Sequence, residues 1–355
     1  MQQLSSRIRL RFAPRPLVYK WWGSFVVWLL TLGSAFAQEG WSSGISLPTG
    51  RDLARAVAVG GRLYVIGGHN ASGELGAVQS FDAATSAWKV QASMPTPRHQ
   101  MAVGVINGII YVAGGCCPTS NVLEAFDPRH NTWTTKALMP IATEPAGTVA
   151  NGILYAIGGN AHGFCTNAVQ AYNASTNTWA LVSPMLTPRC HLAAVTVSGL
   201  IYAIGGTDTS GNLHLQTMEV YDPVSDRWSP AANMPTGRCL LAAAALDSKI
   251  YVLGGNNPEE PKEPRGPIDN YISNSVIFGP GSSKDHSPLR ANLEVYDPST
   301  KKWATGSPMP TARTGVAVAV LGSSLYAVGG NGMTAFLPTN ETFRPQSSRS
   351  DAPSH

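Results

Sequence analysis

The sequence predicts an all-β fold, a six-bladed propeller whose ring is closed by an N-terminal strand completing the C-terminal blade. Three repeated features predict it: a Gly-Gly pair after a short apolar segment, one Trp per unit, and a Met-Pro-like pair followed by Arg. The units repeat every 44–49 residues except across the fifth. Four-stranded propeller blades have this period, so one ring is expected to account for most of the 355 residues.

The second strand of each unit is expected to end at its Gly-Gly pair. A glycine there permits positive φ and close approach of the neighbouring blade, because it has no Cβ. A Tyr precedes each pair by three residues, as Tyr64 precedes Gly67. The first glycines of the six pairs are Gly67, Gly114, Gly158, Gly205, Gly254 and Gly329.

The outer and inner strands are predicted by different residue types. A Trp follows an aromatic-Asp-Pro-like turn in most units, and such large rings fill the wedge between twisted sheets. The stretch after each Arg, such as 242–245, is small and apolar, which suits the innermost strand beside the axis. The expected outer-strand residues are Trp88, Trp133, Trp179, Trp228 and Trp303.

The ends of the repeat predict how the ring closes. The last unit finishes at 340–345 and lacks a Trp and a fourth strand. Trp41, followed by Leu47-Pro48 and Arg51, has the pattern of a fourth strand placed before the first full unit. The N-terminal strand should therefore complete the C-terminal blade and leave no open edge.

This combined pattern resembles the kelch repeat, and the resemblance covers nearly all of residues 41–346. It implies a six-bladed kelch β-propeller whose ligand commonly lies on the face carrying the loops after the Gly-Gly pairs. The chain also bears a more distant resemblance to the periplasmic sialic-acid mutarotases, which act at the propeller mouth. The copper-dependent galactose-oxidase relatives share the repeat, but their Tyr, Cys and His set has no match here.

The first 37 residues predict a secretory signal peptide. A basic segment ends at Lys20, an uncharged stretch runs from Trp21 to Phe36, and Ala35-Phe36-Ala37 predicts cleavage after Ala37. An uncleaved membrane anchor is the alternative, because the uncharged stretch approaches the length of a short spanning helix. The protein is expected to be secreted or periplasmic, with no membrane span in the mature chain.

The net charge of +4 belongs to this segment. Five of the 25 basic residues and none of the 21 acidic ones precede position 38, so the remainder carries a net charge of −1. A nearly neutral domain without a basic stripe argues against nucleic acid as a partner.

The loops after the Gly-Gly pairs and the segments around each Arg should share one rim of the ring. The alternative for any one of these residues is an ordinary turn former, since Asn, Asp and Thr favour such positions. The candidate ligand-binding residues are Arg51, His69, Arg98, His99, Gln100, Asn160, Arg189, His191, Thr207, Asp208, Arg238, Asn256, Arg313 and Asn331.

Glu144 is assigned to the position where five other units carry Arg, and it is a weak candidate for an acid or base. A substitution salt-bridged to a neighbouring Arg is the alternative. No other residue is predicted to be catalytic.

The fifth unit contains an insertion at 257–291, which is either a lid over the ligand face or an unstructured decoration. Residues 347–355 are expected to form a polar tail.

The cysteines predict one disulfide, from Cys165 to either Cys116 or Cys117, if their loops approach within bonding distance. Cys190 and Cys239 have ligand chemistry for zinc or copper together with His99 and His191, but their spacing is that of the repeat itself. No metal and no cofactor is predicted.

Two functions remain. The first is a non-catalytic, exported binding module for a protein, peptide or glycan, because the sequence contains no triad, P-loop or metal motif. The second is a carbohydrate-active enzyme of the sialic-acid mutarotase type, acting at the propeller mouth. A deep polar funnel would favour the enzyme, and a broad shallow face would favour the binding module.

Overall fold

The computed structural model describes residues 40–209, 214–257, 289–332 and 334–345. The predicted signal peptide, most of the insertion at 257–291 and the predicted tail at 347–355 lie outside the described residues. Every regular element in the described part of the chain is a β-strand, and no helix there could cross a membrane.

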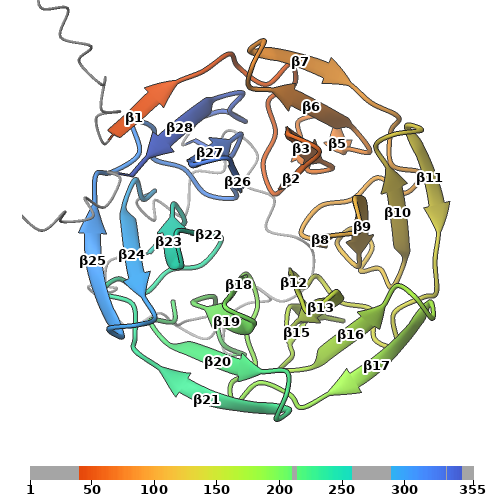
Figure 1. Cartoon of the computed structure of the whole chain (residues 1–355), viewed down its shortest axis with the longest axis vertical. Helices are drawn as coiled ribbons and strands as arrows, with labels where there is room; N and C mark the ends of the chain where they lie inside the picture. Colours follow the sequence, from red (N-terminus) through yellow and green to blue (C-terminus); the bar gives the residue numbers. More distant parts are fainter. Residues whose placement is uncertain (1–39, 210–213, 258–288, 333, 346–355) are drawn as a thin grey trace, which may run out of the picture. The chain divides into compact units, whose positions relative to one another are not determined.

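Six four-stranded antiparallel sheets surround an axis, which confirms the predicted propeller (Figure 1). Blades 1 to 3 are β2(Arg55–Val59)-β3(Arg62–Ile66)-β6(Val78–Asp82)-β7(Ala87–Val90), β8(Ala102–Ile106)-β9(Ile109–Ala113)-β10(Leu123–Asp127)-β11(Thr132–Thr135) and β12(Ala146–Ala150)-β13(Ile153–Ile157)-β16(Val169–Asn173)-β17(Thr178–Val182). Blades 4 to 6 are β18(Ala193–Val197)-β19(Leu200–Ile204)-β20(Met218–Asp222)-β21(Arg227–Ala231), β22(Ala242–Leu246)-β23(Lys249–Leu253)-β24(Leu293–Asp297)-β25(Lys302–Gly306) and β26(Ala317–Leu321)-β27(Ser324–Val328)-β28(Asn340–Arg344)-β1(Gly40–Ser43).

The sixth blade joins the two ends of the propeller. Strand β1 pairs antiparallel with β28, and Trp41 lies opposite Phe343. The N-terminal strand therefore completes the C-terminal blade, as the missing Trp of the last unit predicted.

Two short hairpins extend the loops after the second strands. β4(His69–Asn70) pairs with β5(Gly73–Glu74) in blade 1, and β14(Asn160–Ala161) pairs with β15(Phe164–Cys165) in blade 3. Both follow a Gly-Gly pair, so both lie on the side of the ring that carries the links from each fourth strand to the next blade. This side is called the rim face below.

The Gly-Gly pairs permit close contact between successive blades. Gly67 has a φ of 62°, and a Cβ at this position would lie 2.5 Å from the carbonyl oxygen of Arg98, on the link to blade 2. Any larger residue would separate the two blades, which confirms the predicted role of the glycine.

Each outer-strand Trp attaches its blade to the preceding one. The indole N–H of Trp133 in blade 2 donates to the carbonyl of Ala92, 2.9 Å away, in the segment after β7. All six blades repeat this bond at 2.8–2.9 Å, from Trp41, Trp88, Trp133, Trp179, Trp228 and Trp303. Each ring also packs on an aromatic residue of the third strand, with centroids 5.0–5.2 Å apart.

The repeated arginines also connect successive blades, from the inside. The carbonyl of Arg98 accepts a hydrogen bond from Gly68 of blade 1, while its guanidinium donates to the carboxylate of Glu124 in blade 2, 2.5 Å away. Arg189, Arg238 and Arg313 pair in the same way with Glu219, Glu294 and Glu341, and Arg51 pairs with Gln79.

All five arginine side chains are 0–1% exposed. This finding corrects their assignment as ligand-binding residues, because burial removes Arg51, Arg98, Arg189, Arg238 and Arg313 from the surface. Their terminal guanidinium nitrogens donate inside the protein, whereas, among the described residues, Nε has a hydrogen-bond partner in Arg98 and none in the other four. Burial lowers the pKa of Arg51 to about 10. Burial also lowers the pKa of Arg98, and the pairing with Glu124 opposes that shift.

We predict that Arg98→Thr costs about 3–5 kcal/mol of folding free energy, because it leaves Glu124 buried without its charge partner. Adding Glu124→Gln should recover at least about 1 kcal/mol, since blade 3 already combines Thr143 with Gln170 at the equivalent positions. Guanidinium denaturation of the two variants checks this. Equal stabilities would contradict an electrostatic role for the pair.

Candidate functional site

The rim face brings the two predicted sets of residues together. The residue after each Arg forms a β-bridge with the residue after the Gly-Gly pair of the following blade, the one that the link leads into, which places both sets around the axis. The bridges are Asp52–His69, His99–Cys116, Cys190–Thr207, Cys239–Asn256 and Thr314–Asn331, and Glu144 donates its N–H to the carbonyl of Asn160.

Burial divides the predicted ligand-binding residues. Asn160, His191 and Asp208 are partly exposed, so a ligand on the rim face could reach them. The others are at most 9% exposed and serve mainly to build the rim; they are His69, His99, Gln100, Thr207, Asn256 and Asn331.

The structure corrects the register of Glu144. Thr143, not Glu144, occupies the arginine position of blade 3, because its carbonyl accepts the N–H of Gly115 as that of Arg98 accepts the N–H of Gly68. Glu144 instead corresponds to His99. The predicted alternative, a salt bridge to a neighbouring Arg, is not among the ion pairs of the described residues.

A ring of backbone hydrogen bonds surrounds the axis at the next position along the chain. The N–H of Gln100 donates to Leu53, Leu53 to Gly315, Gly315 to Leu240, and Leu240 to His191, at 2.8–3.2 Å. All five residues have φ between 52° and 58°. Each belongs to a link with three residues between the Arg and the innermost strand.

Blade 3 interrupts this ring. Only Glu144 and Pro145 separate Thr143 from β12, one residue fewer than in the other links. The interruption falls between His191 and Gln100. A cavity of about 20 Å³ lies there, and its lining includes Arg55, Gln100, Glu144, His191 and Leu240. This volume accommodates about one water molecule.

The cavity combines groups with opposed protonation preferences. Burial raises the pKa of Glu144 to about 7, although the nearby charge of His99 acts in the other direction. Burial lowers the pKa of His191 to about 4, and the charges of His214, His99 and Arg55 lower it further. Burial also lowers the pKa of Arg55 to about 10. The site can therefore exchange a proton at Glu144 near neutral pH while His191 stays neutral.

Two histidine–carboxylate pairs flank this cavity. Glu74, at the end of the β4–β5 hairpin, contacts Nδ1 of His99, and Asp52 lies 3.7 Å from Nδ1 of His69. Asn331 donates to the second oxygen of Asp52, 2.9 Å away. The two imidazoles are edge to face, with centroids 5.8 Å apart.

Three of these residues were missed in the sequence. Arg55 could have been found, because it is the one charged residue at the start of an innermost strand, where the other five blades have Ala. Asp52 could also have been found, because it directly follows Arg51 as the predicted residue His99 follows Arg98. Glu74 carries no sequence signal, since its place depends on the two-residue strands of a hairpin.

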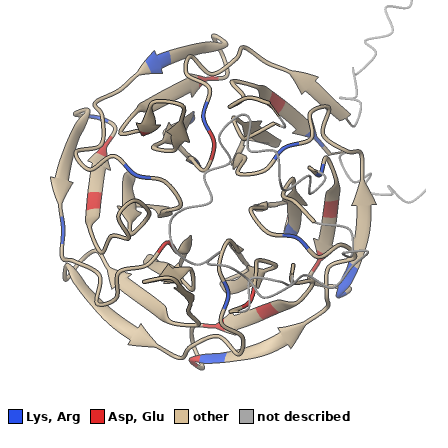
Figure 2. Ribbon diagram, turned by 180° about the vertical axis from the view of Figure 1, so that it is seen from behind, with Lys and Arg blue, Asp and Glu red and all other residues tan. Residues whose placement is uncertain are grey.

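Below the constriction a cavity of about 260 Å³ follows the axis between the innermost strands. Its lining is mainly Ala, Val, Leu and Gly, with Arg55 and Thr148 as polar exceptions. Small side chains are thus found beside the axis, as expected. Charged residues are spread around the ring without one basic stripe (Figure 2).

The disulfides differ from the prediction. Cys116 is bonded to Cys117, and Cys165 is bonded to Cys190, whose Cα lies 5.0 Å away. Cys165 therefore joins the link into blade 4 rather than the loop of blade 2, because its own hairpin folds back over that link. Cys239 is a buried free thiol whose pKa burial raises to about 12. The metal site considered in the sequence analysis, formed by Cys190, Cys239, His99 and His191, is incomplete in this structure, because the sulfur of Cys190 is bonded to Cys165.

The fold and rim define a class of protein, the six-bladed kelch propeller with its candidate ligand site around the axis. A profile of the Attractin/LZTR1 β-propeller family matches residues 63–278, more than half of the chain. The chain belongs to that family.

Individual relatives share the repeats over shorter stretches. Human Kelch-like protein 23 is 26% identical over 185 residues, covering 50% of this chain and 32% of the relative. Kelch-like protein terF of Aspergillus terreus is 28% identical over 186 residues, covering 47% and 40%. Kelch-like ECH-associated protein 1A of Danio rerio is 36% identical over 108 residues, covering 29% and 18%. The chain thus spans well under half the length of these relatives.

Among solved structures, that of YjhT superposes with a TM-score of 0.69 at 17% identity, covering 84% of this chain and 96% of the other. At this identity the similarity establishes the fold alone.

We predict that Glu144→Gln stabilises the protein by about 2 kcal/mol at pH 8, after allowance for partial solvent screening. Between its ordinary pKa of 4.5 and its folded pKa of about 7, Glu144 holds a proton in the folded state that the unfolded chain releases. The parent therefore loses stability as the pH rises through this window, whereas the Gln variant does not lose this contribution.

Denaturation of both proteins from pH 4 to pH 8 measures the difference, which should vanish below about pH 4.5. His191 acts in the opposite sense over part of the window, because its lowered pKa makes stability fall with falling pH. It is present in both proteins and cancels in the comparison. A difference independent of pH would contradict the assignment.

Proposed function

We propose that this protein is an exported kelch-propeller binding module whose rim face recognises a protein or peptide. Export is inferred from the basic segment, the uncharged stretch and the Ala35-Phe36-Ala37 sequence at the N-terminus. If this inference is right, the full chain expressed with its N-terminal segment yields an extracytoplasmic product that begins at Gln38 by mass spectrometry.

An exposed aromatic residue on a fixed support carries the proposal. Phe164 is 67% exposed at the start of β15, on the rim face. The next residue, Cys165, is disulfide-bonded to Cys190, which holds this hairpin to the link into blade 4. A large ring presented on a rigid backbone is typical of binding hot spots, because little conformational freedom is lost when the partner docks.

The shape of the mouth also supports binding over catalysis. The backbone ring narrows the axis, and the cavity beside Glu144 has a volume of about 20 Å³. A sugar or another metabolite would need a larger space than this one, since ligand pockets usually measure some hundreds of cubic ångströms. The cavity of about 260 Å³ below it is lined mainly by apolar side chains, with few polar groups to bind a sugar. The name of one relative, Kelch-like ECH-associated protein 1A, describes association with another protein, which agrees with the proposal.

One observation favours a second function, the carbohydrate-active enzyme. Glu144 has a pKa of about 7 and lies near the His99–Glu74 pair, so it could exchange protons with a sugar hydroxyl at the mouth. Turnover of a bound sugar by the parent chain that is lost in Glu144→Ala would identify this function.

The experiment screens the chain from Gln38 against a peptide-display library and a glycan array. Selected peptides should lose about thirtyfold or more in affinity with Phe164→Ser, since truncation of a hot spot costs about 2 kcal/mol. Val224→Ser is the matched control, because Val224 is 89% exposed in the turn between β20 and β21, on the opposite face. Equal losses in both variants, or peptide binding unaffected by Phe164→Ser, would refute the proposed surface.

A further inference from the structure

We propose that His99, Cys116 and Cys117 form a zinc-binding site that becomes available when the Cys116–Cys117 disulfide is reduced. The site lies between blades 1 and 2 on the rim face. It goes beyond the proposed binding function and does not depend on it.

The backbone brings the three side chains together. His99 and Cys116 form a β-bridge, with N–H to carbonyl distances of 2.9 and 3.1 Å in the two directions. The ligand atoms of His99, Cys116 and Cys117 all lie within 4.8 Å of one another. One bound ion could therefore contact all three after small side-chain rotations.

The site is protected but reachable. His99 is 2% and Cys116 is 4% exposed, whereas Cys117 is partly exposed. An ion or a reductant can thus approach from the Cys117 side, while the other two ligands are held by the protein around them.

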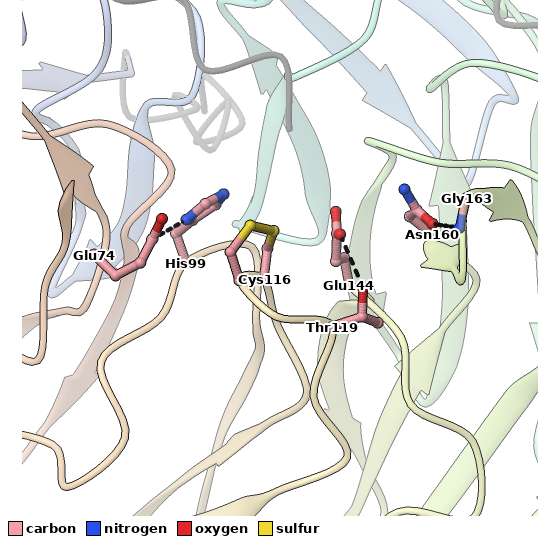
Figure 3. Close-up of a disulfide and its surroundings, with 8 residues drawn as sticks. Glu74, His99, Cys116, Thr119, Glu144, Asn160 and Gly163 are labelled. Carbon is pink, nitrogen blue, oxygen red and sulfur yellow. Dashed lines mark hydrogen bonds and ion pairs between the residues drawn. A yellow bond between two sulfur atoms is a disulfide. The ribbon is translucent and has the colours of Figure 1, made fainter. Parts of the chain in front are cut away.

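Glu74 prepares the imidazole for this role. Its carboxylate contacts Nδ1 of His99 (Figure 3), which favours the tautomer with the proton on Nδ1 and leaves Nε2 available as a ligand. A carboxylate on the second nitrogen is the usual support of a histidine that binds metal, because it fixes the tautomer and raises the basicity of the ligand. This contact therefore orients one ligand of the proposed site.

The donor chemistry selects the ion. Two thiolates and one imidazole are typical ligands of zinc, and three protein ligands leave one coordination position open. Glu144 lies on the other side of the disulfide from His99 (Figure 3).

Reduction is the step that exposes the ligands. A dithiol reductant transfers two electrons and two protons, the bond between the two sulfurs breaks, and two thiols form as the reductant becomes a disulfide. Zinc then binds the two thiolates and releases their protons to solvent. A disulfide oxidant such as oxidised glutathione reverses the step: it takes two electrons and two protons from the two thiols and becomes two thiols, while the Cys116–Cys117 bond forms again and the two sulfur ligands are lost.

The test measures Zn²⁺ binding to the chain from Gln38 carrying Cys165→Ser and Cys190→Ser, so that only one disulfide can be reduced. The protein is compared before and after treatment with dithiothreitol, which is then removed under anaerobic conditions. We expect one Zn²⁺ per reduced molecule by equilibrium dialysis and metal analysis, and at least tenfold weaker binding to the oxidised one.

Three further variants assign the ligands on the same background. Cys116→Ser with Cys117→Ser should abolish the difference between the two redox states. Glu74→Gln, which preserves the donor set, should weaken binding to the reduced form by about 10–100-fold. His130→Gln is the control, because that histidine is 75% exposed and is paired with Asp127 in the turn between β10 and β11.

Circular dichroism verifies that each variant is folded. Equal Zn²⁺ binding by the oxidised and reduced proteins, retention of Zn²⁺ without Cys116 and Cys117, or no Zn²⁺ on the reduced background would each overturn the proposal.

Discussion

The structure depends on the contact between successive blades. On the side nearer the axis, the arginine after each Met-Pro-like pair makes this contact. The backbone carbonyl of such an arginine, for example Arg98, accepts a hydrogen bond from the Gly-Gly turn of the preceding blade. Its side chain donates hydrogen bonds inside the following blade. A fully buried guanidinium is unfavourable unless its donors are used, and here carbonyls and a glutamate use them. The glycines follow from the same contact, since a Cβ on Gly67 would collide with the carbonyl of Arg98.

The candidate site arises where this regularity fails. Blade 3 has Thr143 in place of the arginine and Gln170 in place of its carboxylate partner, and Gln170 bonds the backbone of Ile141 instead. The same link is one residue shorter, which interrupts the backbone ring around the axis and leaves Glu144 beside the gap. Glu144 keeps the backbone bond to Asn160 that belongs to its position in the repeat, and its side chain lines the cavity at the gap.

The sequence predicted the repeating parts well because the same physical requirement is met six times. The Trp41 closure, the glycines and the small residues beside the axis follow from packing that every blade shares. The five arginines were wrongly predicted to lie at the surface, because a basic residue beside a turn is ordinarily exposed. The only sequence signal for their burial is the glutamate in the third strand of the following blade, which pairs with the arginine in four of the five cases. Glu144 was placed one position early, although the repeat itself marks the register: the Arg lies four residues after Met94 and Met309, and the residue four after Met139 is Thr143.

Loop contacts could not be predicted in the same way, as the cysteines show. Cys165 was expected to reach the blade 2 loop, but the two-residue strands of its hairpin direct it to Cys190. A disulfide therefore joins blade 3 to the link into blade 4. On the other side of blade 3, toward blade 2, Thr143 replaces the buried arginine. The irregular blade is therefore held by a different bond from the regular ones. This arrangement lets its rim carry Glu144 and Phe164 without opening the ring, because the disulfide fixes the hairpin independently of the repeat.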